Sequence, residues 1–197
     1  TIGSRPPIHQ SSITASHYAL DSHAVRKREE GRVHLDGFLS YPSAVYTVPY
    51  GVMVPKEVGN LLLPVPVSGS HIGFSTLRME PCWMAMGQAA GIASALSIDG
   101  KVKVQNIDLS RLQDKLIDQK ATLMYFKDVD YMSPHFRMVQ YLGLRGYLPE
   151  WTARLQEPVD MATLTAWKKL SGKDLPGIEA GKTTRLVALE MIYRKIK

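Results

Sequence analysis

The chain has 197 residues, of which 45% are hydrophobic and 21% charged, with a mean hydropathy of -0.11. This composition excludes a chain that is disordered over most of its length, because disordered chains carry too little apolar material. Cys82 is the only cysteine, which excludes a disulfide framework and a zinc site built on cysteines. The net charge of +6 is modest and spread along the chain, so it does not by itself indicate a polyanionic partner.

The first 67 residues are rich in Tyr, Val and Pro and show almost no helical periodicity. Residues 16–23 and 46–54 are the clearest strand candidates. Pro49 and Pro55 place the second candidate at the edge of a sheet, since proline donates no ladder hydrogen bond. We therefore expect the N-terminal part of the chain to be rich in strands.

Residues 60–67 hold a short apolar run, which predicts a buried strand, and residues 68–78 are predicted to form a loop. Residues 81–98 form the longest uncharged run, about long enough for a membrane span. The glycines and polar residues within this run favour a buried helix that begins at Pro81, so we predict no membrane span. A strip of small residues follows helical spacing along it, and a flat ligand or another backbone can approach such a strip closely: Gly87, Ala90, Gly91 and Ser94.

The remainder of the chain is predicted to be helical. Asp108 is the expected N-cap of a helix with Leu112 and Leu116 on one face. Further helices are expected to start at three later places: Ser133–Pro134, Asp160, and Thr183 or Thr184.

Two polar clusters have competing interpretations. His17, Asp21 and His23 offer three possible metal ligands, but a polar strand face near a cleft is the favoured interpretation, and we predict no metal site. The basic residues 26–28 are followed directly by two glutamates, which favours a solvated loop over a nucleic-acid site. We therefore predict no nucleic-acid partner.

The segment NLLLPVPVSGSHIGFSTLRMEPCWMAMGQAAGIASAL, residues 60–96, resembles the closing segment of an FAD-dependent oxidoreductase family. These are glutathione-reductase-like flavoproteins, whose bacterial members are often labelled xanthan lyases. RMEP followed by GQAAG is the most specific part of this resemblance. Weaker similarities to the same family follow in order along the chain: DSH at 21–23, YTVPYGVMVPK at 46–56, FKDVD at 126–130 and QYLGLRGYLPEW at 140–151.

The resemblance implies an α+β chain that is the C-terminal portion of a larger FAD/NAD(P)-binding-type α/β flavoprotein. Residues 1–58 would end a substrate-side β-sheet, residues 59–120 would supply the closing strand and helix of the FAD-binding domain, and residues 121–197 would form a helical C-terminal domain. The sequence contains no GxGxxG turn for the ADP half of FAD. We therefore expect FAD in the complete protein, and neither FAD binding nor activity in this chain without the missing N-terminal FAD-binding region.

The resemblance also implies which residues face the cofactor. These are a loop and one position of the small-residue strip: Ser75, Thr76, Leu77, Arg78, Met79 and Gly87. Reduction places negative charge on the N1 and C2-carbonyl edge of the flavin ring, and a helix N-terminus stabilises such charge. Arg78 would add a full positive charge and raise the reduction potential. The alternative is that Arg78 pairs only with Glu80 or Glu57 and that the helix is plain core.

His71 is the favoured residue to face the substrate and accept a proton, because it is predicted to lie in a loop after a buried strand. His23 and Asp21 are further catalytic candidates. The alternative for His71 is a hydrogen bond to the backbone with no role in chemistry.

Three functions remain open on the sequence. The favoured one is the C-terminal part of an FAD-dependent oxidoreductase that acts on a small-molecule or carbohydrate-related substrate. The second is a polysaccharide lyase of the xanthan type, in which Tyr and His abstract a proton beside a uronate. The third is a cell-surface polysaccharide-binding module, since FKDVD, QYLGLRGYLP and TRLVALEMIYRKI faintly resemble surface-layer homology repeats.

Overall fold

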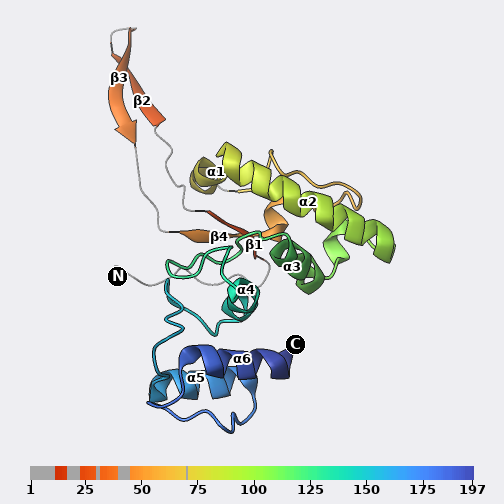
Figure 1. Cartoon of the computed structure of the whole chain (residues 1–197). Helices are drawn as coiled ribbons and strands as arrows, with labels where there is room; N and C mark the ends of the chain where they lie inside the picture. Colours follow the sequence, from red (N-terminus) through yellow and green to blue (C-terminus); the bar gives the residue numbers. More distant parts are fainter. Residues whose placement is uncertain (1–11, 17–22, 30–31, 40–44, 70) are drawn as a thin grey trace.

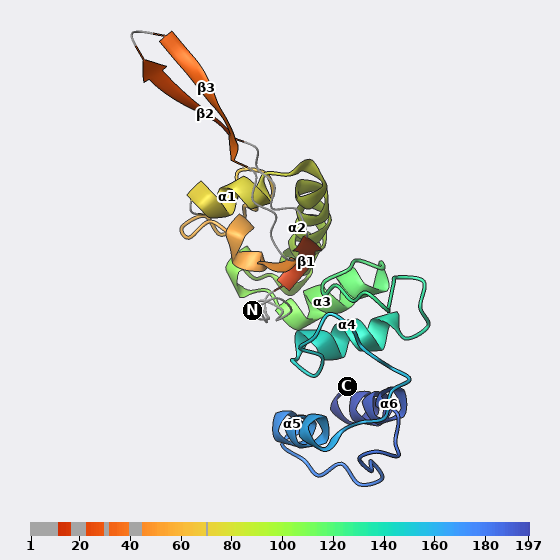
Figure 2. The ribbon, with the colours of Figure 1, turned by 90° about the vertical axis from the view of Figure 1, so that its left-hand side faces the viewer.

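The computed structural model describes residues 12–16, 23–29, 32–39, 45–69 and 71–197. In chain order, the strands and helices of these residues are β1 (Ser12–Ser16), β2 (His23–Glu29), β3 (Arg32–Leu39), β4 (Tyr46–Pro49), the 3₁₀ helix η1 (Tyr50–Met53), α1 (His71–Leu77), α2 (Glu80–Gly100), the 3₁₀ helix η2 (Val104–Asn106), α3 (Leu109–Asp118), α4 (Phe136–Leu144), α5 (Met161–Ser171) and α6 (Arg185–Ile196). The β2–β3 hairpin lies at one end of the molecule and the α5–α6 pair at the other (Figures 1 and 2).

The strands of the described chain all belong to its N-terminal part, as the sequence predicts. β1 pairs antiparallel with β4, and β2 pairs antiparallel with β3. Most of the expected strand over residues 16–23 lies outside the described residues, which include only its ends, Ser16 of β1 and His23 of β2. The coarse α+β expectation holds, with far more helix than strand.

The predicted strand over residues 46–54 is too long. β4 ends at Pro49, and the chain continues as the 3₁₀ helix η1. Tyr50 and Met53, three residues apart, are both buried, as a helix with three residues per turn allows and an alternating strand does not. The Tyr50 hydroxyl donates a hydrogen bond of 2.9 Å to the Val104 carbonyl, and burial raises the pKa of Tyr50 to about 12, so the phenol remains a donor.

Residues 60–67 form no strand, contrary to the prediction. Pro64 and Pro66 lack the N–H groups that a ladder needs, and Leu61 and Val65 are exposed. The segment is instead held at its ends, where the Leu63 N–H donates to the Met53 carbonyl at 2.8 Å and the Ser68 N–H donates to the Val52 carbonyl at 2.6 Å. The closing strand expected here is therefore wrong.

Residues 68–78 were expected to form a loop, but most of them form helix α1. The Arg78 N–H donates to the Phe74 carbonyl at 3.0 Å and closes the last turn of this helix. The seven-residue element is too short for a clear apolar period, so its sequence pattern does not distinguish it from a loop.

Helix α2 spans the uncharged run as predicted, with proline early in its first turn. Its buried positions recur every three or four residues and form one core-facing stripe: Cys82, Met86, Ala89, Ala90, Ala93 and Leu96. Lys101 ends the helix in the left-handed region at φ 49°, with the Val102 N–H donating to the Ser97 carbonyl. Among the described residues, no helix is both long and apolar enough to cross a membrane.

Three of the later helices begin where side-chain caps were expected, whereas α4, expected to start at Ser133–Pro134, begins at Phe136 after His135, which makes no side-chain cap. Asp108 accepts from the amides of Ser110 and Arg111, Asp160 accepts from the Thr163 amide, and Thr184 accepts from the Val187 amide. Gly172 ends α5 at φ 61°. Not every apolar residue on these helices faces inward: Leu164 and Trp167 of α5 are buried, whereas Met161 and Leu170 are exposed.

One hydrophobic cluster connects these elements, from Ile13 of β1 through α2, α3 and α4 to Ile192 of α6. α2 packs on β1 and α3, α3 packs on α4, and α4 packs on α6. The α1–α2 junction therefore stands on a continuous core.

Candidate functional site

The predicted cofactor-facing residues lie at the junction of α1 and α2. α1 ends at Leu77, Arg78 forms the turn, and Met79 is the extended N-cap of α2 at φ -77° and ψ 132°. Leu77 is buried, while Arg78 and Met79 are half-buried. The buried Leu77 side chain thus anchors the junction, and the next two residues, Arg78 and Met79, are partly exposed to solvent.

A contact from β4 fixes the end of α1. The Tyr46 hydroxyl donates to the Thr76 carbonyl at 3.1 Å, and the Thr76 hydroxyl donates to the Gly73 carbonyl at 2.9 Å. Thr76 is therefore engaged within the fold through both groups. The local sequence gives no signal for this role of Tyr46, because the hydrogen bond joins residues 30 positions apart.

The first turn of α2 has an unusual set of backbone donors. Met79 makes no side-chain cap, Pro81 has no N–H, and the amides of Cys82 and Trp83 both donate to the Met79 carbonyl. The Glu80 amide is therefore the only N–H of this turn that makes no hydrogen bond within the helix. The positive end of the helix dipole adds to this donor, and an anion near it is stabilised by about 0.3–1 kcal/mol.

A buried donor without an acceptor lies in the same turn. The Trp83 indole N–H is buried and finds no acceptor within the described part of the chain. Three other buried side-chain atoms share this property, namely Thr47 Oγ1, Trp151 Nε1 and Arg154 Nε. A buried N–H normally has a partner, so Trp83 was an overlooked functional candidate. Its only signal in the sequence is its position two residues after Pro81.

The small-residue strip of α2 is divided between two faces. Ala90 belongs to the core, whereas Gly91 and Ser94 are exposed. A Cβ atom added to Gly87 or Gly91 would meet nothing within 4 Å. The strip as predicted is therefore not one continuous surface, but Gly87 does leave open space about two turns after the junction.

The catalytic candidates are more scattered. His71 is the first residue of α1, so the seven-residue helix, about 10 Å long, separates it from Arg78. Ser75 also belongs to α1, and His23 begins β2 opposite Leu39 of β3. Asp21, like His17, lies outside the described residues. Within the described ranges, no group of three His, Cys, Asp or Glu residues is arranged to hold a metal ion.

A comparison with known families decides the identity of this region. The profile of the family described as FAD dependent oxidoreductase matches residues 5–116, more than half of the chain. The chain belongs to the FAD-dependent oxidoreductase family. The matched range includes both α1 and α2, and membership implies FAD for the complete protein. No curated protein and no solved structure matches the chain.

The residues of the junction fit an FAD ring in their chemistry. They comprise a cation, an indole donor, an amide donor and the positive end of a helix, with Arg78, Trp83 and Glu80 as the contributors. The N1 and C2-carbonyl edge of a flavin is rich in acceptors and becomes negative on reduction. Donors and positive charge are the groups that such an edge requires.

Proposed function

We propose that this chain is the C-terminal part of an FAD-dependent oxidoreductase and that its α1–α2 junction contacts the flavin ring. The observation that carries the proposal is the start of α2, where no side chain caps the helix and the Glu80 amide and the Trp83 indole N–H have no acceptor among the described residues, within the range of the family match. Asp108, Asp160 and Thr184 supply such a cap for α3, α5 and α6, whereas α4, like α2, has none. An electron-rich ligand at α2 would replace the missing acceptor.

FAD supplies the two-electron acceptor of the reaction. In this proposal, Arg78 and the α2 dipole stabilise negative charge at the ring edge, and the Trp83 indole N–H donates a hydrogen bond there. Ser75, Thr76, Leu77 and Met79 shape the approach, and the absence of a side chain at Gly87 allows close contact. His71, His23 and Asp21 are the substrate-side candidates.

The proposed domain arrangement follows the sequence. Residues 1–58 end the substrate-side region, residues 59–120 contribute to the FAD-binding domain, and residues 121–197 form the helical domain. The substrate is a small-molecule or carbohydrate-related compound. The family match supports an oxidoreductase over the polysaccharide lyase and the polysaccharide-binding module.

Visible absorption of bound flavin tests the cofactor part of this proposal. We expect the complete protein to carry FAD and the 197-residue chain to be colourless, because its sequence has no GxGxxG turn for the pyrophosphate. Stoichiometric flavin on the 197-residue chain would show that the pyrophosphate is held in another way. It would overturn the proposal that a region outside this chain binds the ADP half of FAD.

A matched pair of substitutions tests the position of the ring in the complete protein. Gly87→Leu places a side chain in the open space about two turns along α2 from the junction and should lower the FAD content if the ring extends over this part of the helix. Ala95→Leu adds the same side chain at an exposed position about 12 Å further along α2 and should leave it unchanged. Equal FAD contents in both variants would contradict a ring beside Gly87.

A further inference from the structure

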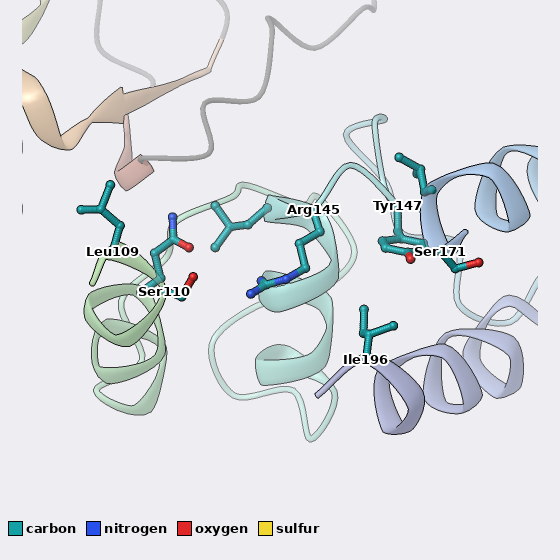
Figure 3. A pocket seen from close by; sticks show the side chains of 9 residues that line it. Leu109, Ser110, Arg145, Tyr147, Ser171 and Ile196 are labelled. Carbon is teal, nitrogen blue, oxygen red and sulfur yellow. The ribbon is translucent and has the colours of Figure 1, made fainter. Parts of the chain in front are cut away.

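A cleft lies between α3, the C-terminal end of α4, α5 and α6, away from the α1–α2 junction. Its volume is about 870 Å³, and Figure 3 shows the side chains that line it. Clefts of this size accommodate small organic molecules. Its lining combines polar side chains such as Ser110 and Ser171 with apolar ones such as Leu170 and Ile196.

Arg145 supplies a positioned cation to this cleft. One of its terminal nitrogens donates to the Tyr141 carbonyl at 3.1 Å, and its guanidinium carbon lies 3.4 Å from the centroid of the Tyr141 ring. Within the described residues Arg145 has no ion pair, unlike Arg137 with Asp114 and Asp118. Its side chain extends towards Ser110 of α3 (Figure 3). The charge is therefore held in place and left without a counter-charge.

Tyr147 supplies a hydroxyl donor at another part of the same cleft. The residue as a whole is only 3% exposed, and it lines the cleft. In Figure 3 it lies beside Ser171 and Ile196, on the opposite side of the view from the Arg145 guanidinium. Burial raises the pKa of Tyr147, against the opposing effect of the Arg145 charge, so the phenol is a proton donor at neutral pH.

We propose that this cleft binds a small organic carboxylate that has an apolar body and a hydrogen-bond acceptor at its far end. Arg145 pairs with the carboxylate, Leu170 and Ile196 contact the body, and the Tyr147 hydroxyl donates to the far acceptor. A carboxylate would form a charge-assisted hydrogen bond with the half-buried Arg145, and an acceptor at the far end of the ligand would take the hydrogen bond of the Tyr147 hydroxyl. The inference is independent of the flavin proposal, because it uses none of the junction residues.

The test is a titration of the 197-residue chain with 4-acetylbenzoate, followed by amide chemical shifts. This probe has a carboxylate, an apolar ring and a ketone acceptor, and 4-acetylbenzamide is its uncharged counterpart. We expect shifts at the ends of α3, α4 and α5 and weaker binding of the amide. Arg145→Gln should raise the Kd about tenfold or more, and Tyr147→Phe about threefold to tenfold.

Arg194→Gln is the matched control, since it removes the same charge from an exposed position of α6 outside the cleft and should leave the Kd unchanged. Ser171→Trp should abolish binding by filling the cleft, and circular dichroism verifies that each variant folds. If the Arg145→Gln variant does not fold, the Kd values of Tyr147→Phe and Ser171→Trp test whether the probe binds in this cleft. Equal binding of acid and amide, shifts confined to other surfaces, or no binding at all would overturn the proposal.

Discussion

The α1–α2 junction and helix α5 treat their polar groups in opposite ways. At the junction, α2 begins without a side-chain cap and the Trp83 indole N–H has no acceptor among the described residues. In the C-terminal helices, Asp160 caps α5, and the buried Trp167 indole donates to the Tyr147 carbonyl at 2.8 Å. The contrast holds for α5 and Trp167 but not for the whole C-terminal part, where the buried Trp151 Nε1 and Arg154 Nε also lack a partner among the described residues.

The buried amide of Gln140 is the clearest case of internal satisfaction. Its Oε1 accepts from the amides of Leu123 and Met124, both at 2.8 Å, and its Nε2 donates to the Met124 carbonyl at 2.6 Å. One side chain from α4 thus holds the backbone of the preceding segment through three hydrogen bonds. The start of α2, in contrast, has no side-chain cap.

The largest expected effect is on stability in the C-terminal part. Gln140→Leu leaves three buried backbone groups unpaired and should lower the free energy of unfolding by about 3–5 kcal/mol. Urea unfolding of the 197-residue chain measures this loss. Gln105→Leu is the control, because the exposed Gln105 also bonds to backbone carbonyls and should cost less than about 1 kcal/mol. Equal losses of unfolding free energy in Gln140→Leu and Gln105→Leu would contradict the claim that the buried hydrogen bonds of Gln140 contribute more than the exposed ones of Gln105.

A pair of tryptophan substitutions tests the contrast directly. Trp167→Phe leaves the buried Tyr147 carbonyl without its donor and should cost about 1–3 kcal/mol of unfolding free energy. Trp83→Phe removes an indole N–H that has no acceptor in the described structure, so it should cost less than about 1 kcal/mol in the 197-residue chain. A larger loss for Trp83→Phe than for Trp167→Phe, measured by urea unfolding, would contradict this account.

Exchanging the helix caps should have smaller effects of opposite sign. Asp160→Ala removes the cap of α5 and should lower the free energy of unfolding. Met79→Asp introduces a cap and a favourable charge at α2 and should raise it by about 0.5–1 kcal/mol in the 197-residue chain. Thermal unfolding of the two variants distinguishes these outcomes. A destabilised Met79→Asp variant would mean that the start of α2 is already satisfied.

The smallest effect expected is a pH dependence at the α5 cap. Hydrogen bonds from the amide and hydroxyl of Thr163 lower the pKa of Asp160 below its ordinary value of 3.8. The contribution of this carboxylate is therefore present above the unfolded-state pKa and is lost as the pH falls through the lower folded-state pKa. Asp160→Asn should flatten the stability profile only in this acid range. If Asp160→Asn changed the pH dependence of the unfolding free energy equally at neutral and at acid pH, another group would be responsible for the titration.

The sequence predicts helix starts well where a cap or proline defines them. Asp108, Asp160, Thr184 and the early proline of α2 all lie where expected, because capping depends on local backbone geometry. The apolar run of residues 60–67 misleads, since two prolines prevent a ladder that its hydrophobicity suggests. Helix α1 was missed because seven residues show too little periodicity.

For the candidate site too, the sequence predicts the local features and not those that depend on contacts between distant residues. The stretch from Thr76 to Met79 is contiguous in the chain, so its placement at one junction follows from the sequence alone. The Tyr46 contact with Thr76 spans 30 positions, and the burial of the Trp83 indole depends on packing by other elements. Neither is visible in a local pattern. The cleft around Arg145 joins four segments and also required the fold.

The reduction potential of Arg78→Ala in the complete FAD-containing protein tests the central claim most directly. If Arg78 stabilises the reduced ring by about 1–3 kcal/mol, the two-electron potential should fall by about 20–65 mV, with little change in FAD content. Glu80→Ala removes an exposed carboxylate from the next residue but one and should leave the potential nearly unchanged. A lowered melting temperature with an unchanged potential in Arg78→Ala would make Arg78 a structural ion-pair residue and contradict a flavin at the α1–α2 junction.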